Sequence, residues 1–462
     1  MYADIIIKNG RCVTMCGDGG ADWVAAAGKM ICAAGRGDDW QKLVRPGTQV
    51  IDARGGTVLP GFIDNHFHVM QTAVNMMSVD LGGARSHREL GEMLAAAEKR
   101  EGAVLGCQVE ESQFEEKRFP DRYVLDRYCS DSPVVLFSKE YHVSMLNTHA
   151  LLYYKVPFSL EGVELDGSGL PTGIFRRNAN YVLRSNVLRS LPDEFRMEAI
   201  HLAMSRLLEN GITTVAAIEG GWLFDDRDAE FIYAHSGEFP VDMPLFYQTM
   251  DLAKVWKLGL RRVGGNIMVD GTLSSHSAAL SAPYADRPDY RGQIFLPQDG
   301  LDEFVQQCYR QDMQLALYSI GDRAIESVLL AHERAIRQGG STALRHRIEH
   351  AIMATPEQIA RAADMKLIFS VQPASAYLWG LGAGEGLGDG AAPGGRALSA
   401  LQQLCRHVRR RRGGVRRVGQ RRDGAAAHAG YPRGGEPRRA PVRRVRGAGH
   451  RDVHRQRRLR AV

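Results

Sequence analysis

The sequence predicts an α/β protein in which a small β-rich segment precedes a parallel barrel or a doubly wound sheet. Short strand patterns with turn residues occupy residues 4–58, and strand and helix patterns then alternate as far as Trp379. Repeated β-then-α units over such a length are typical of parallel sheets covered by helices. The chain has 462 residues, 44% hydrophobic and 24% charged. This globular composition excludes a collagen-like, coiled-coil or wholly disordered protein.

The first 58 residues are expected to form the N-terminal half of a β-sandwich. The apolar run Asp4–Lys8 ends at Asn9-Gly10, a dipeptide typical of hairpin turns. Two more hairpins are predicted, Trp23–Ala27 with Met30–Ala34 and Thr48–Ala53 with Thr57–Leu59, because Gly-containing turns separate the strands of each pair.

Residues 59–380 are predicted to form the α/β domain. The expected strands are Val134–Phe137, Ile212–Val215, Ile267–Val269, Leu315–Tyr318, Ile368–Val371 and a short strand at Ile348. The expected helices are Glu89–Lys99, Glu194–Glu209, Asp302–Arg310 and Ala324–Gln338. A further helix is expected to begin after Thr355, because Thr is a favoured N-cap and Pro356 suits the first helical position.

Charge divides the chain into two parts. Residues 381–462 contain 21 arginines, no lysine and five acidic residues, so they carry +16 of a chain whose net charge is +6. Residues 1–380 therefore carry −10, which excludes a globally basic nucleic-acid-binding protein. Because residues 381–462 are rich in Arg and Gly and poor in apolar residues, we expect them to be disordered.

The composition of this tail also suggests a change of reading frame. Arginine without lysine, together with Gly, Ala, Pro and Val, is what GC-rich codons encode when they are read out of frame. We hypothesise a frameshift between about Tyr377 and Arg396. DNA that encodes the tail in one continuous frame would contradict this hypothesis.

Cysteine usage and the first residues indicate a cytoplasmic protein. The seven cysteines are thinly spread and include no C-x-x-C pair, a pattern typical of reduced thiols. The start of the chain has no basic region followed by an apolar one, so we expect no signal peptide. Apolar runs of about 18 residues are also missing, so we expect no membrane span.

The strongest chemical motif is Leu59–His68, which reads Leu-Pro-Gly-Phe-Ile-Asp-Asn-His-Phe-His. His66 and His68 alternate near the end of an expected strand, so both imidazoles lie on one face. Two imidazoles on one face can bind one divalent metal ion through ring nitrogens. A bare H-x-H pair is a weak signal, but its attachment to a strand and to Pro-Gly-Phe-Ile-Asp makes it specific.

The motif resembles the metal-binding first strand of the amidohydrolase superfamily, in the branch known as amidohydrolase family 3. The resemblance continues in order over roughly residues 4–379. Its matching segments are Asp131–Ala150, Gly169–Gly173, Gly211–Val215, Asp270-Gly271 with Ala278–Leu280, Ile320–Ala324, Arg345–His350 and Ser370–Pro373. The resemblance implies a (β/α)8 TIM-type barrel with a small β-sandwich, and divalent metal, expected to be zinc with iron or manganese as alternatives, at the carboxyl end of the barrel.

Roles for particular residues follow from the resemblance. It implies that His66, His68 and His350, which ends the expected sixth strand, are metal ligands. His142, placed at the end of the expected second strand, has a substrate-contacting role. From their strand-end positions, Glu219 is a candidate to complete the metal site and Asp270 a candidate catalytic acid. Both could instead be structural residues that shape turns.

Several positions depart from the family pattern. Asn266 stands where the family often has a lysine, and Tyr318 replaces the fifth-strand histidine. Arg177 replaces an acid, and Gly-Ser-Asp, expected from an eighth strand, does not occur after Pro373. The barrel is therefore expected to be incomplete at its eighth strand.

We predict a hydrolase that cleaves a non-peptide C–N bond of a small amide, formamide or N-acyl compound with metal-activated water. The alternatives are an inactive, truncated or frameshifted product of the same family and, more weakly, a nucleic-acid-binding protein that uses the basic tail. The expected partner is a small-molecule amide, with no nucleic acid and no membrane, and a homo-oligomer is left open.

Overall fold

The computed structural model describes residues 2–373 except 16–19, 140, 222–223 and 274. The predicted tail 381–462, the hypothesised frameshift and the place of an eighth-strand Gly-Ser-Asp lie outside the described residues. Strands of the described part form sheets of seven, six, four and two strands. No helix in this part is long and apolar enough to cross a membrane.

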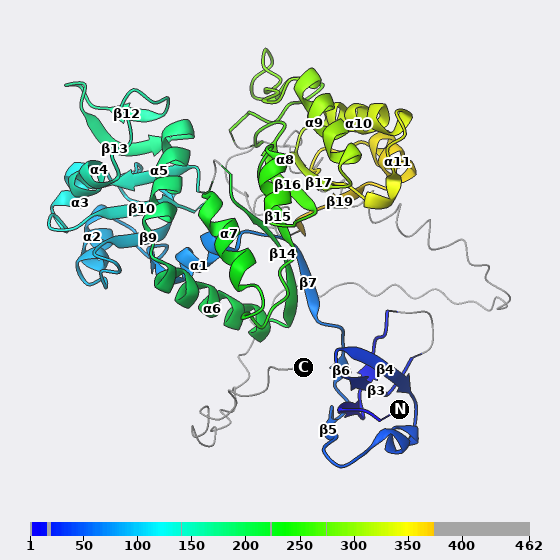
Figure 1. Ribbon diagram of the computed structural model, residues 1–462. Coiled ribbons are helices and arrows are strands. Elements are labelled where there is room, and N and C mark those ends of the chain that lie inside the picture. The colour runs from blue at the N-terminus through cyan, green and yellow to red at the C-terminus, as the bar shows by residue number, and fades with distance from the viewer. Residues whose placement is uncertain (1, 16–19, 140, 222–223, 274, 374–462) are drawn as a thin grey trace, which may run out of the picture. The chain divides into compact units, whose positions relative to one another are not determined.

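The seven-stranded sheet is parallel throughout, and its spatial order follows the chain (Figure 1). Its strands are β7 (Phe62–Phe67), β14 (Ile212–Glu219), β15 (Leu245–Tyr247), β16 (Arg262–Met268), β17 (Gln314–Ser319), β18 (Arg347–His350) and β19 (Ile368–Ser370). Parallel strands in chain order with helical crossovers define a TIM-type barrel, and seven of its strands lie in the described part. The predicted fold class is confirmed.

Helices connect these strands. They are α1 (Val69–Met77), α6 (Asp193–Glu209), α7 (Asp226–His235), α8 (Leu252–Lys257), α9 (Gln298–Arg310), α10 (Asp322–Arg337) and α11 (Pro356–Asp364). The predicted end of α6 is confirmed, since Asn210 is its C-cap and Gly211 follows with φ 74°. The predicted start of α11 is also confirmed, because Thr355 and Gln358 form a capping box.

A six-stranded mixed sheet is inserted between β7 and β14. It contains β8 (Val79–Asp80), β9 (Val104–Val109), β10 (Val134–Ser138), β11 (Val143–Leu146), β12 (Val163–Leu165) and β13 (Pro171–Arg176). Its helices are α2 (His87–Ala95), α3 (Arg122–Asp126), α4 (Thr148–Tyr154) and α5 (Arg177–Ser190). The prediction of β10 as the second barrel strand was wrong, because β10 pairs with β9 and β11 and the second barrel strand is β14. A fully buried strand has the same apolar pattern in either sheet.

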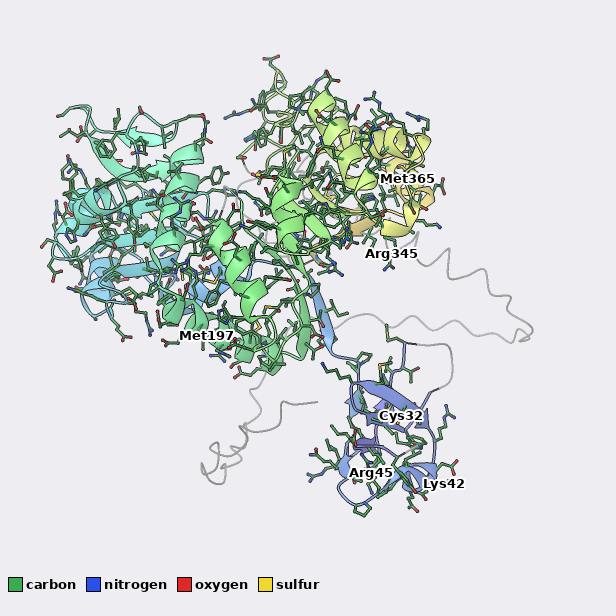
Figure 2. All side chains as sticks on the ribbon, viewed as in Figure 1. Cys32, Lys42, Arg45, Met197, Arg345 and Met365 are labelled. Atoms are coloured by element: carbon green, nitrogen blue, oxygen red, sulfur yellow. The ribbon has the colours of Figure 1, made fainter. Side chains whose placement is uncertain are left out.

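The N-terminal segment forms two small sheets. One has the order β4-β3-β1-β5, from β1 (Ile5–Lys8), β3 (Trp23–Ala27), β4 (Met30–Gly35) and β5 (Gln49–Asp52). The other pairs β2 (Arg11–Cys12) with β6 (Thr57–Val58). Only the β3–β4 hairpin is confirmed, because β1 pairs with β3 and β5, and not with the strand after Asn9-Gly10. Arg45, labelled in Figure 2, donates through Nη2 to Oδ1 of Asp4 at 2.5 Å. This contact links the loop before β5 to the start of β1.

The barrel sheet separates two apolar layers. A large cluster on its outer side includes Val215 and Ala217 of β14, packed with the surrounding helices. Ala216, Ile218, Phe246 and Ala316 form a separate small cluster. Because side chains alternate across a strand, this small cluster marks the inner face of the barrel. Residues two positions further along these strands therefore share that inner face.

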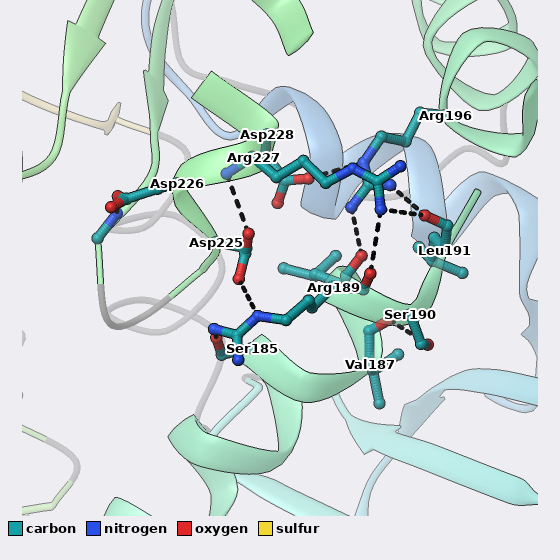
Figure 3. Close-up of polar contacts among 12 residues, drawn as sticks. Ser185, Val187, Arg189, Ser190, Leu191, Arg196, Asp225, Asp226, Arg227 and Asp228 are labelled. Carbon is teal, nitrogen blue, oxygen red and sulfur yellow. Dashed lines mark hydrogen bonds and ion pairs between the residues drawn. The ribbon is translucent and has the colours of Figure 1, made fainter. Parts of the chain in front are cut away.

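A buried ion pair joins three helices beside the barrel (Figure 3). Arg196 of α6 is fully buried and donates through Nε to Asp228 Oδ1 of α7 at 3.0 Å. Its two Nη groups donate to the carbonyls of Leu188 and Leu191, where α5 ends. One guanidinium therefore caps a helix end and pairs with one oxygen of a buried carboxylate, whose Oδ2 has no hydrogen-bond partner.

Removal of one partner from this pair should be costly. Asp228→Ala would leave the buried Arg196 charge with only the half-exposed carboxylate of Asp193, 3.6 Å from its Nη1, so we expect a loss of about 3 kcal/mol in the free energy of unfolding. Urea unfolding of the purified variant measures this loss. The control Glu209→Ala removes an acid from the exposed Arg206–Glu209 pair and should cost less than about 1 kcal/mol. Equal losses in the two variants would contradict a special role for the buried pair.

Candidate metal centre and substrate cleft

Three histidine rings lie together at the carboxyl ends of the first and sixth barrel strands. The ring centroid of His66 is 5.2 Å from that of His68 and 4.8 Å from that of His350. His66 and His68 come from the end of β7 and the start of α1, and His350 ends β18. The structure thus brings together the three predicted ligands.

A buried chain of hydrogen bonds orients His66. Its Nδ1 lies 2.7 Å from Oε2 of Glu349, whose side chain is fully buried. Arg347 donates to both oxygens of the same carboxylate, at 2.7 and 3.0 Å. Burial raises the pKa of Glu349, but the bonds from His66 and Arg347 outweigh it and hold the pKa below its usual value. The ionised carboxylate therefore fixes the His66 ring and leaves Nε2 as its metal-binding atom.

His68 is held in the same way by the neighbouring strand. Its Nδ1 lies 3.0 Å from the carbonyl oxygen of Ile218, so Nδ1 carries the proton and Nε2 is left for a metal ion. Glu219, the next residue, accepts backbone hydrogen bonds from Val69 and Met70 through Oε1. Glu219 thus caps the start of α1, and its Oε2 is buried without a hydrogen-bond partner. Burial, followed by the carboxylate of Asp228, raises the pKa of Glu219 well above its usual value.

The position of His350 depends on its backbone. Strict alternation along β18 would send the side chains of Glu349 and His350 to opposite faces. His350 and Ala351 have φ angles of 68° and 47°, in the left-handed region that non-glycine residues rarely adopt. This bend directs the imidazole towards His66 and places it 4.5 Å from the ring of Tyr318. Such strain is typical of functional sites.

The chemistry of the three rings fits a divalent metal ion. Burial and the neighbouring His66 lower the pKa of both His68 and His350 to about 3, so these rings are neutral at pH 7 as ligation requires. As placed, no three His, Cys, Asp or Glu side chains of the described residues converge closely enough to hold an ion. The rings contact one another edge to face instead, so ligation needs their rotation about the side-chain bonds.

Unpartnered carboxamides stand at the same end of the barrel. Oε1 and Nε2 of Gln248 and Oδ1 of Asn266 are buried without hydrogen-bond partners. Gln248 follows the inner-face residue Phe246 by two positions, and Arg347 stacks 4.6 Å above the Phe246 ring. Buried orphan groups of this kind indicate a bound ion, water or ligand. Asn266 thus places a neutral carboxamide where the family often has a lysine.

Tyr318 occupies the position of the expected fifth-strand histidine. Its hydroxyl donates to the carbonyl oxygen of Gly271 at 3.4 Å, and its ring packs against His350. Burial raises the pKa of Tyr318 well above its usual value, and a protonated phenol is a weaker metal ligand than the neutral imidazole that it replaces. Tyr318 therefore does not supply the nitrogen ligand that the family pattern has on this strand.

A cleft of about 1290 Å³ opens beside these strands. Polar and apolar side chains share its wall, among them His142, Arg177, Tyr181, Ser185, Gly221, Gln248, Lys254, Ile267, Met268, Gly271, Thr272, Tyr290, Phe295 and Leu296. His142 follows β10 in the inserted sheet, which corrects its predicted place on a barrel strand. Burial, followed by the nearby positive charge of Arg184, lowers the pKa of His142. Arg177 pairs with Glu161 at 2.5 Å on the cleft wall.

Asp270 connects the ends of two barrel strands. Its Oδ1 accepts from the backbone N–H of Ile320 at 2.9 Å, and Oδ2 accepts from those of Ala279 and Gly321 at 2.8 and 2.7 Å. Both oxygens are thus engaged by backbone groups, and the carboxylate anchors the segment after β16. The catalytic role of Asp270 stays a prediction.

Similar folds occur among metal-dependent hydrolases. A metal-dependent hydrolase from Pyrococcus furiosus superimposes with a TM-score of 0.68 and 24% identity over 82% of this chain and 79% of that protein. A metal-dependent hydrolase from Pyrococcus horikoshii superimposes with a TM-score of 0.68 and 23% identity, over 80% of this chain and 75% of that protein. At these identities the likeness shows the fold alone.

Sequence comparison establishes the family. The amidohydrolase family model matches residues 49–407, so the match continues past residue 380 into the segment set apart by its charge. Protein LONG AFTER FAR-RED 3 of Arabidopsis thaliana is 27% identical over 81% of this chain and 68% of its own length. N-substituted formamide deformylase of Arthrobacter pascens is 26% identical over 78% of this chain and 71% of its own length. The chain belongs to the amidohydrolase family and is a hydrolase of carbon–nitrogen bonds.

Sequence reasoning did not identify Glu349 as the residue that orients His66. The available signal was Arg347-x-Glu349, whose side chains share one face of a strand that ends at a predicted ligand. The sequence contains no such signal for Gln248. The lack of hydrogen-bond partners for its carboxamide becomes visible only when the neighbouring residues are placed.

Replacement of Glu349 should weaken metal binding. Glu349→Gln keeps the shape but removes the charge that fixes the His66 ring, so we expect zinc affinity to fall about 10- to 100-fold. Competition with a chromophoric chelator measures this affinity. Glu357→Gln changes an exposed acid in the first turn of α11 and should leave the affinity unchanged. Wild-type affinity in Glu349→Gln would contradict the orienting role.

Asp270 predicts a pH dependence of stability. Burial, partly offset by three backbone N–H groups, raises its pKa to about 6, against about 3.9 in an unfolded chain. Between about pH 4 and pH 6 the folded protein keeps a proton that the unfolded chain has lost, so the contribution of Asp270 to stability falls as pH rises. Urea unfolding across this window should show a shallower fall for Asp270→Asn than for the wild type. Parallel curves would contradict the raised pKa.

Proposed function

We propose that this protein is a metal-dependent amidohydrolase that cleaves a non-peptide C–N bond of a small amide, formamide or N-acyl compound. The observation that carries the proposal is the group of three clustered imidazoles with one ring fixed by a buried carboxylate. The group lies at the carboxyl ends of barrel strands, where TIM-type barrels have their active sites. The similarity to N-substituted formamide deformylase supports the amide class.

His66, His68 and His350 would hold the metal ion, which we propose to be zinc, with iron or manganese as alternatives. A bound divalent cation supplies a Lewis acid and a nucleophilic water at neutral pH. Glu349 keeps His66 in one tautomer, and Ile218 does the same for His68. Both contacts thus set the tautomers of the two ligands before an ion binds, whereas the ring orientations change on ligation.

The cleft would hold the substrate; His66, His68 and His350 do not line it, and Gln248 of the same end of the barrel does. The apolar residues of the cleft, including Ile267, Phe295 and Leu296, exclude water from the body of a small substrate. Gln248 offers a donor and an acceptor that lack partners, which suits the N–H and C=O of an amide. His142 would contact the substrate from the opposite wall. We propose a small-molecule partner and a cytoplasmic location, with no role for nucleic acid or membrane.

An inactive member of the family is the second candidate. Tyr318 packs against His350 where the family pattern has a ligand, and Asn266 is neutral where a lysine is often found. Both differences reduce the number of metal ligands. Protein that binds no zinc, iron or manganese and hydrolyses no member of an N-acyl and formamide panel would favour this candidate.

The metal-binding proposal predicts the effect of one substitution. His66→Ala removes the central ring of the three, so bound metal and amide hydrolysis should both fall below one tenth of their wild-type levels. Metal content by mass spectrometry and an amine-release assay measure the two effects. His201→Ala, on the exposed face of α6, should retain both. Full activity in a metal-free His66→Ala protein would exclude the proposal.

A further inference from the structure

Among the described residues, Arg184 is a buried cation that forms no ion pair. The residue lies on α5 and is 8% exposed. No carboxylate of the described residues forms an ion pair with it. An ionised side chain that leaves water without a counter-charge costs several kcal/mol. Burial lowers the pKa of Arg184 only to about 10, so the guanidinium remains charged at neutral pH.

The contacts of Arg184 are weak substitutes for a counter-ion. Nη2 donates to Oε1 of Gln71 at 2.8 Å, whereas Nε is buried with no partner. The guanidinium carbon lies 5.6 Å from the ring centroid of Tyr141 and 5.3 Å from that of Phe224. The two rings can offer cation–π attraction but neutralise none of the charge.

The other cations around the cleft are all paired. Each lining Arg or Lys of the described residues has an acidic partner: Arg176 with Glu164 at 3.8 Å, Arg177 with Glu161 at 2.5 Å, Arg189 with Asp225 at 2.8 Å, and Lys254 with Asp226 at 2.5 Å. These pairs are all partly exposed. Arg184 therefore combines deeper burial with the lack of a partner.

Arg184 does not line the cleft itself, but residues beside it reach the candidate site at two places. Tyr181 and Ser185, its neighbours on α5, line the cleft. The Phe224 ring lies 4.8 Å from the ring of His68 and contacts Arg184 as well. The positive charge of Arg184 acts on both His68 and His142 and lowers the pKa of each. An anion bound to Arg184 would thus lie close to the histidine cluster.

We propose that Arg184 binds a carboxylate of the substrate, so that the preferred substrates are N-acyl amino acids or similar amides with a carboxylate near the scissile bond. A planar carboxylate matches the geometry of a guanidinium, would accept from the unpaired Nε–H and would neutralise the buried charge. This inference rests on the proposed amidohydrolase function. It adds the chemical class of the substrate and the residue that selects it.

Binding to the metal-free protein tests the inference without turnover. The two probes are N-acetyl-leucine and N-acetylisoamylamine, which differ only in the carboxylate. Calorimetric titration of wild-type protein should show about 10- to 100-fold tighter binding of the acid. Arg184→Gln should reduce this preference to about one, and Arg184→Lys should retain part of it because the charge remains without the planar fork. Arg206→Gln, on the exposed face of α6, should keep the wild-type preference.

Equal binding of the two probes by the wild type would overturn the inference, and this comparison needs no variant to fold. An unchanged preference in a folded Arg184→Gln protein, checked by its thermal melt, would overturn it as well. Failure of the proposed function gives a different result. A protein that binds the acid through Arg184 but hydrolyses neither probe with metal restored would retain the carboxylate site and lose the hydrolase proposal.

Discussion

The site depends on one buried chain of contacts inside the barrel, from Arg347 through Glu349 to His66. Arg347 also donates to the backbone carbonyl of Asn65 and to Ser370 Oγ at 3.0 Å, so its guanidinium links the first, sixth and seventh strands. A charged pair is costly to bury unless all its hydrogen bonds are made. Here the Glu349 carboxylate accepts hydrogen bonds from two side chains, and Arg347 donates to three residues. These bonds hold the His66 imidazole in place.

Electrostatics divides the region into a neutral part and a positive part. The rings of His68 and His350 are kept neutral by burial, as metal ligation requires. Arg184 lies nearby and keeps its charge, because even in a poorly hydrated position its pKa remains far above 7. A positive charge beside neutral ligands attracts an anionic substrate without competing for the metal ion. In the proposed function the two parts would serve different steps, metal binding and substrate selection.

Regular patterns in the sequence predicted much of the fold, and their failures share one cause. Strand alternation and helical periodicity placed β17, α6 and α10 near their observed bounds, and the short strand expected at Ile348 is β18. The same alternation could not assign β10 to a sheet, because strand pairing depends on distant residues. Asn9-Gly10 forms a turn but not the expected hairpin, since the parallel pairing of β1 with β5 takes the edge that β2 would have used.

The sequence by itself determined the family, the fold class and the presence of His66, His68 and His350, because local spacing encodes the strand ends on which these residues stand. Only the tertiary structure decided how they meet. The left-handed backbone at His350 redirects a ring that alternation would place on the other face. Glu349 acts on His66 across 283 positions of the chain. That Arg184 has no acidic partner among the described residues is likewise a property of its surroundings, because it becomes visible only when those residues have been placed.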